Sequence, residues 1–123
     1  MSERVRCVLI KAHGGGIFEC DSRKFSYDDI PIGAMWDAKW KRRKGPDGRA
    51  IYVMMPGRVA WFIDGRCSNC TRMDDATHHC WVRHGEPPGL TVDKNGDTCS
   101  AGAGSIIVPG WHGFLRNGWL ETR

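Results

Sequence analysis

The stretch from Cys67 to Cys99 constrains this chain most. It holds four of the six cysteines and three of the five histidines, and Cys67 and Cys70 have the C-x2-C spacing of a rubredoxin-like knuckle. Two thiolates at this spacing can bind one metal, because the turn between them points amide hydrogens at the sulfurs. A structural zinc ion needs about four ligands. The candidate ligands are Cys67, Cys70, His79, Cys80, Cys99 and His112.

More than one ligand set fits these spacings. One set follows the pattern C-x2-C-x9-C-x3-H, and a second is brought together by hairpins. The first set does not match a zinc ribbon, which has two C-x2-C knuckles, or a C2H2 finger. Neighbours on a strand face opposite ways, so at most one of His78 and His79 serves as a ligand. The two sets are Cys67, Cys70, Cys80 and His84, and Cys70, Cys80, Cys99 and His112.

The cysteines have two other interpretations. Free cysteine packs well as a small buried hydrophobe, and cysteines can also pair as disulfides. No signal peptide is predicted, because the amino terminus has an apolar run of only Val8–Ile10. A chain kept in a reducing cytoplasm uses clustered cysteines as metal ligands or free thiols more often than as disulfides. This favours a metal site.

Glycine and proline predict the fold class. The chain has 16 glycines and six prolines in 123 residues, and both residue types are unfavourable inside helices. We expect a single mainly β domain, residues 1–123, of short antiparallel hairpins stapled by a metal site in 67–112. Loops are expected at 22–32 and 85–89. The expected strands are 5–10, 17–20, 35–41, 51–55 with 58–63, 79–83, 105–108, and two hairpins, 90–100 around Asn95-Gly96 and 111–120 around Asn117-Gly118.

A basic run provides a candidate contact surface. The formal net charge is +4 and the pI is about 8.8, which permits a polyanionic partner without requiring one. Basic residues are dense between Lys39 and Lys44, where lysine and arginine can meet phosphates and a tryptophan can stack on a base. A solvated strand end is the alternative. The candidate contacts to nucleic acid or a partner protein are Trp40, Lys41, Arg42, Arg43 and Lys44.

Two apparent motifs lack residues that they require. Asp93–Asp97 begins like a calcium loop, but Thr98 and Gly104 stand where that loop needs glycine and glutamate. His13-Gly14-Gly15-Gly16 resembles an esterase oxyanion loop, but the chain has no G-x-S-x-G elbow. No catalytic residue is assigned.

Several segments resemble a known group of proteins. They include Ser68-Asn69-Cys70, His79–Gly85, Ala101–Ile106 and Trp111–Leu115. Over about residues 30 to 120 the chain resembles small proteins of unknown function encoded by tailed phages and prophages. Some of these are labelled ammonia monooxygenase. That enzyme is a membrane complex, and no segment here is apolar enough to span a bilayer, so the sequence does not support the label.

Three functions follow as hypotheses. The first is a non-enzymatic binding module, stabilised by zinc and encoded by a phage, that contacts a protein or a nucleic acid. The second is a virion accessory protein, such as a head-decorating or tail-associated subunit. The third is a small metal-dependent enzyme with an open zinc position. Because no signal peptide and no membrane-spanning segment are predicted, we expect a location in the host cytoplasm, or in the virion, and no membrane partner.

Overall fold

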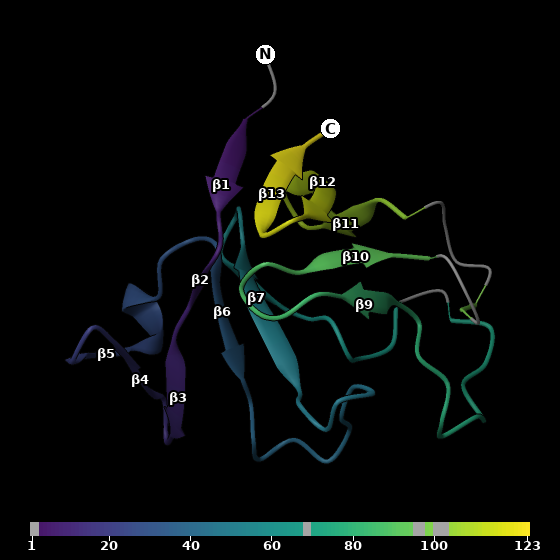
Figure 1. The fold of residues 1–123 in the computed structure, drawn as a ribbon, viewed down its shortest axis with the longest axis horizontal. Helices are drawn as coiled ribbons and strands as arrows, with labels where there is room; N and C mark the ends of the chain where they lie inside the picture. Colours follow the sequence, from purple (N-terminus) through teal and green to yellow (C-terminus); the bar gives the residue numbers. More distant parts are fainter. Residues whose placement is uncertain (1–2, 68–69, 95–97, 100–103) are drawn as a thin grey trace.

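The structure is a computed structural model that describes residues 3–67, 70–94, 98–99 and 104–123 (Figure 1). The predicted mainly β fold is confirmed. The only described helix is the short 3-10 turn Tyr27–Asp29, and no described helix is long and apolar enough to span a bilayer. The strands are β1 (Arg4–Arg6), β2 (Val8–Leu9), β3 (Lys11–Gly14), β4 (Ile17–Cys20), β5 (Arg23–Ser26), β6 (Ala34–Asp37), β7 (Ile51–Met55), β8 (Val59–Phe62), β9 (Val82–His84), β10 (Thr91–Asp93), β11 (Ile106–Val108), β12 (Trp111–Arg116) and β13 (Trp119–Thr122).

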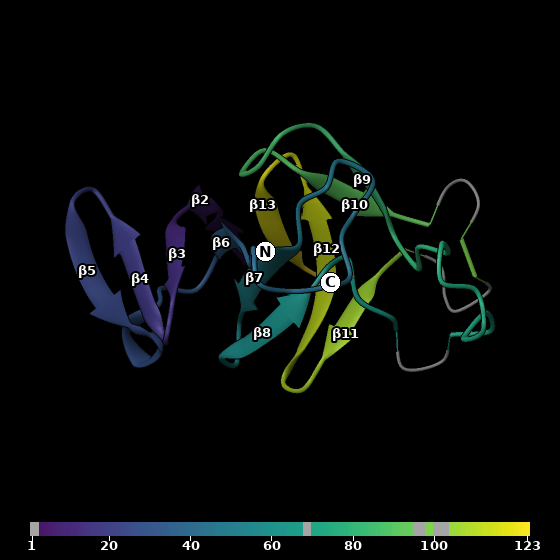
Figure 2. The ribbon, with the colours of Figure 1, turned by 90° about the horizontal axis from the view of Figure 1, so that it is seen from below.

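The strands form small sheets arranged along an elongated molecule. Two sheets have four strands each, in the orders β1-β13-β12-β11 and β2-β6-β7-β8, and all their pairs are antiparallel except β2 with β6. Smaller sheets are β3-β4-β5 and β9-β10. Figures 1 and 2 place β3-β4-β5 at one end of the long axis and the loop that follows β8 toward the other.

The strand predicted over 5–10 is divided between two sheets, and a strand of a third sheet begins at Lys11. Cys7 and Ile10 are both buried while Val8 and Leu9 are 41% and 49% exposed. Buried residues three apart break the two-residue period of a strand, so the chain changes partners at each of them. The Cys7 amide donates to the carbonyl of Gly118, and the Ile10 amide to that of Met35.

The prediction of a loop over 22–32 is wrong in its first part. Residues 23–26 form β5, which pairs with β4 and places Phe25 directly opposite Phe18. Asp21 and Ser22 adopt positive φ angles of 51° and 66° in the turn. This is the backbone of a type I′ hairpin turn, formed here without glycine.

Two predicted hairpins are confirmed. β7 pairs with β8, and β12 pairs with β13 through Asn117 and Gly118, whose φ angles of 51° and 79° fit a type I′ turn. The other predicted Asn-Gly turn, Asn95-Gly96, lies outside the described residues. The strand before it, β10, pairs with β9.

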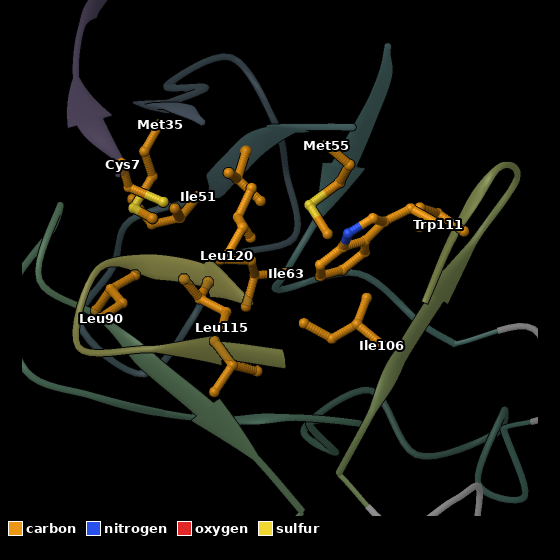
Figure 3. Packing of buried hydrophobic residues seen from close by; sticks show 13 residues of the cluster. Cys7, Met35, Ile51, Met55, Ile63, Leu90, Ile106, Trp111, Leu115 and Leu120 are labelled. Atoms are coloured by element: carbon orange, nitrogen blue, oxygen red, sulfur yellow. The ribbon is translucent and has the colours of Figure 1, made fainter. Parts of the chain in front are cut away.

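The main core lies between the two four-stranded sheets. Figure 3 shows Leu115 and Leu120 from one sheet pointing toward Ile51 and Met55 from the other. These four side chains are no more than 1% exposed, and burying each is worth roughly 1.5–3 kcal/mol. A second cluster, which includes Phe18 and Trp36, packs β3-β4-β5 on the other side of β6-β7.

Candidate metal centre

Asp64 fixes the point where the chain leaves β8 for the cysteine-rich loop. Its side chain is buried, its Oδ2 accepts from the Ile51 amide at 2.8 Å, and its Oδ1 accepts from Arg83 Nε at 2.8 Å. Asp64 therefore ties the loop's start both to β7 and to β9. Gly45 makes room for this contact, because a Cβ there would collide with the Arg83 guanidinium.

Four side chains converge beyond this point. One donor atom from each of Cys70, His78, Cys80 and Cys99 lies within 4.8 Å of the others, and all but Cys70 are buried. Thiolates around a tetrahedral ion with bonds of about 2.3 Å lie about 3.8 Å apart. The group therefore has the composition and the spread of a metal site, here called the Cys3His group.

Cys67 lies beside this group as a fifth donor. Its Sγ is 3.6 Å from Cys99 Sγ, and its amide donates to Cys80 Sγ at 3.3 Å. The Cys70 amide donates to the Cys67 carbonyl at 3.3 Å. A sulfur separation of 3.6 Å is far longer than the roughly 2.05 Å of a disulfide. All six cysteines are thiols in the structure.

His78 provides the clearest sign that the group accommodates an ion. The residue is 4% exposed, and neither Nδ1 nor Nε2 has a hydrogen-bond partner among the described residues. Leaving buried polar atoms unpaired costs roughly 1–3 kcal/mol each. A metal bound to one ring nitrogen removes part of that cost.

The surroundings of the sulfurs favour the thiolate form at some cysteines and oppose it at others. Lys94 Nζ lies 3.6 Å from Cys99 Sγ, and a hydrogen bond from the Arg72 amide lowers the pKa of Cys70. Burial raises the pKa of Cys67, and burial raises the pKa of Cys80 to about 12. Because a ligating thiol is deprotonated, metal binding here releases protons and weakens as pH falls.

The structure brings together four of the six predicted ligands, Cys67, Cys70, Cys80 and Cys99, and does not bring His79 or His112 to them. The histidine that joins the group is His78. Residues two apart on an extended chain share a face, so the position of Cys80 favours His78 over its neighbour, a signal that the sequence interpretation missed.

The other histidines lie elsewhere. His112 Nε2 is 3.4 Å from Arg123 Nη1, and His112 pairs in register with Ile107 on the neighbouring strand. His84 Nε2 lies 3.1 Å from Asp93 Oδ2, and its side chain is 52% exposed. His79 is half-buried outside the group, its Nδ1 also lacks a described partner, and burial lowers its pKa.

The basic run at 39–44 is partly used inside the molecule. Arg43 Nε donates to the Asp64 carbonyl at 2.8 Å, and its Nη2 donates to the His78 carbonyl. Arg43 therefore braces the cysteine-rich loop. Lys41 Nζ lies 5.2 Å from the centre of the Phe62 ring, and Lys44 Nζ donates to the Lys39 carbonyl. Trp40, 55% exposed, and Arg42 point to solvent, and the predicted contact to a partner stays a prediction.

A cavity of about 550 Å³ lies apart from the Cys3His group. Its walls come from residues 9–13 and 19–22, with Asp37, Lys39 and Arg49 among the others. His13 Nε2 and Glu19 Oε1, 2.8 Å apart, pair with each other at its edge. The cavity shares no residue with the Cys3His group, and we assign it no function.

The evidence for a metal site at the Cys3His group is the geometry of this chain alone. The resemblance to tailed-phage proteins stays a prediction. Comparison of the chain with protein-family models, with curated proteins and with solved structures finds no match.

Proposed function

We propose that this protein is a non-enzymatic interaction module stabilised by a zinc ion bound to Cys70, His78, Cys80 and Cys99. The observation that carries the proposal is the buried His78 imidazole, with both ring nitrogens unpartnered among the described residues, beside three thiols. Three thiolates and one imidazole are typical ligands of structural zinc, whereas calcium and magnesium prefer oxygen ligands.

The donor count supports a structural site over a catalytic one. Catalytic zinc keeps one position for water or substrate, and structural zinc has four protein ligands. Here four protein donors already lie within 4.8 Å of one another, and Cys67 is at hand as a fifth. Such a set closes the coordination sphere and supports a role in stability.

The ion would join segments that are far apart in the chain. Cys70 follows β8, Cys80 precedes β9, and Cys99 follows β10. The described part of 66–80 consists of turns and bends without a strand, and residues 71–77 are exposed. We infer that zinc replaces the backbone ladder and the apolar core that this part of the chain lacks.

Elemental analysis tests the proposal directly. The full chain, purified without a histidine tag, should contain about one equivalent of zinc, and a chelator should lower its melting temperature. The Cys20→Ser variant is the control, because Cys20 lies on β4 and outside the group. Less than about half an equivalent, with melting unchanged by the chelator, contradicts the proposal.

A phage origin remains part of the proposal and is supported by the sequence resemblance. It leaves open a virion accessory role. Mass spectrometry of purified particles of a phage that encodes this chain distinguishes the two roles, because an accessory subunit is present in the particle and an intracellular module is absent.

A further inference from the structure

The outward face of the β1-β13-β12-β11 sheet carries an unusual set of side chains. Its inward face supplies Leu115 and Leu120 to the core (Figure 3). Residues directly opposite each other on paired strands share a face, and the registers of β1 with β13 and of β12 with β13 place six alternate residues on the outward one. They are Arg4, Arg6, Phe114, Arg116, Trp119 and Glu121.

Arginine guanidinium groups lie over the aromatic rings of this face. Arg4 Cζ is 4.0 Å and Arg6 Cζ is 5.1 Å from the Trp119 ring centre, and Arg116 Cζ is 4.0 Å from that of Phe114. An arginine over a ring keeps N–H donors at the edge of its guanidinium, and these can reach acceptors outside the sheet. The face therefore presents planar groups together with hydrogen-bond donors.

The face is strongly positive. Glu121 is its acid, and its carboxylate is shared at 3.7 Å between Arg4 and Arg116, whose side chains are 51% and 55% exposed. Arg123, at the end of β13, lies against His112 on the same face. Four arginines and one glutamate leave +3 here, against +4 for the whole chain. Most of the excess charge of the protein is therefore on one sheet face.

We propose that this face binds single-stranded nucleic acid. Exposed arginines neutralise phosphates, and unpaired bases stack on aromatic rings and on guanidinium planes. An acidic peptide or an anionic membrane would use the charges but would leave the rings without a role. A duplex keeps its bases stacked inside, where a flat sheet cannot reach them. Rings and charges together fit the single strand.

Binding is measured with a fluorescein-labelled oligo(dT) of about 20 nucleotides and the zinc-loaded full chain. Anisotropy should rise on titration, a duplex of the same length should bind at least about tenfold more weakly, and log K should fall linearly with log salt. Equal affinity for the duplex, or binding only to phosphatidylserine vesicles or a polyglutamate peptide used as parallel probes, overturns the proposal.

Matched variants locate the surface. Arg4→Gln with Arg116→Gln should weaken binding at least about tenfold and reduce the salt slope by about 1.4, since each phosphate contact on a single strand contributes about 0.7. Lys39→Gln with Arg42→Gln removes the same charge from the predicted basic run and should change affinity less than about threefold. A larger loss in the second pair than in the first overturns the assignment to the sheet.

Trp119→Leu tests the stacking. It should weaken binding at least about fivefold and leave the salt slope unchanged. An unchanged affinity in this variant, with melting temperature retained, excludes stacking. The inference needs a folded chain but not a zinc ion in particular. Zinc content measured in the same samples therefore distinguishes failure of this inference from failure of the proposed function. A zinc-loaded chain that does not bind oligo(dT) overturns this inference alone.

Discussion

The two ends of the molecule are built in different ways. At one end, β3-β4-β5 forms an antiparallel ladder, and Phe18 packs on Phe25 and on Trp36 with ring centres 6.5 and 5.3 Å apart. At the other, the described part of 66–80 has no strand, and its contacts run largely through sulfur, the Arg66 and Arg43 guanidiniums and backbone carbonyls.

The difference shows which end depends on an added ligand. A strand ladder satisfies its own amides and carbonyls, and an apolar cluster adds burial. A loop of exposed polar residues gains neither and loses the same conformational entropy per residue. We expect metal binding to provide the missing free energy at the loop end and to leave the sheet end almost untouched.

Removing the metal should have the largest effect. Cys80→Ser deletes a buried donor and should abolish zinc binding, which lowers the free energy of unfolding by about 4 kcal/mol at a zinc concentration about 1,000 times Kd. Hydrogen exchange should then speed up in 70–84 and stay slow in β4. Exchange that accelerates equally at both ends contradicts the division between them, and Cys20→Ser controls for the substitution.

Weakening the packing at the sheet end should lower stability without loss of zinc. Phe18→Ala opens a cavity in the second cluster and should lower the free energy of unfolding by about 3 kcal/mol. Zinc content should stay at one equivalent, because the Cys3His group contains no residue of that cluster. Denaturant unfolding and elemental analysis of the same variant measure both. A loss of zinc would show that the two ends are coupled.

Removing the Arg43 contacts that brace the loop end should have the next largest effect. Arg43→Met removes the donors to the carbonyls of Asp64 and His78 and should cost about 2 kcal/mol, because buried acceptors lose charged donors. It should also weaken zinc binding, measured by competition with a chromophoric chelator. Arg42→Met, the exposed neighbour, should change stability by less than about 0.5 kcal/mol. Equal effects of both variants would exclude the brace.

The next prediction concerns whether His78 or Cys67 is the fourth metal ligand at the loop end. With Co²⁺ in place of zinc, thiolate-to-metal absorption in the near ultraviolet should persist at full intensity in Cys67→Ser. In His78→Ala the affinity should fall about tenfold or more, as expected when a ligand is lost. If Cys67→Ser loses intensity and His78→Ala does not, the site is a four-cysteine site.

The sequence predicts the parts of this fold that local chemistry controls. Asn117-Gly118 supplies a type I′ turn, and the C-x2-C spacing marks Cys67 and Cys70 as neighbours of one site. Tertiary partners decide the rest. The switch of sheets at Cys7 depends on the carbonyls of Gly118 and Gly33, which accept from the Cys7 and Val8 amides. Arg43, interpreted as a phosphate contact, turns inward because two distant carbonyls lie within its reach.

The smallest expected effect concerns the ion pair between Asp47 and Arg83. Hydrogen bonds from Arg83, and then from the Arg49 amide, hold the pKa of Asp47 well below its usual range. A carboxyl whose pKa is depressed in the folded state stabilises the protein above its unfolded pKa of about 3.9 and loses that contribution as pH falls toward the folded value. Because Asp47 is exposed, its pairing is worth less than about 1 kcal/mol.

Asp47→Asn should therefore be slightly less stable than the parent at pH 7, and the gap should close as pH falls below about 4. Urea unfolding at several pH values measures it. Acid also releases zinc, but it does so in both proteins, so the difference between them isolates the carboxyl. Asp28→Asn, on the exposed 3-10 turn, should show no gap. A gap that persists at low pH would mean that the asparagine side chain disturbs the turn, since the protonated carboxyl of the parent no longer pairs with Arg83.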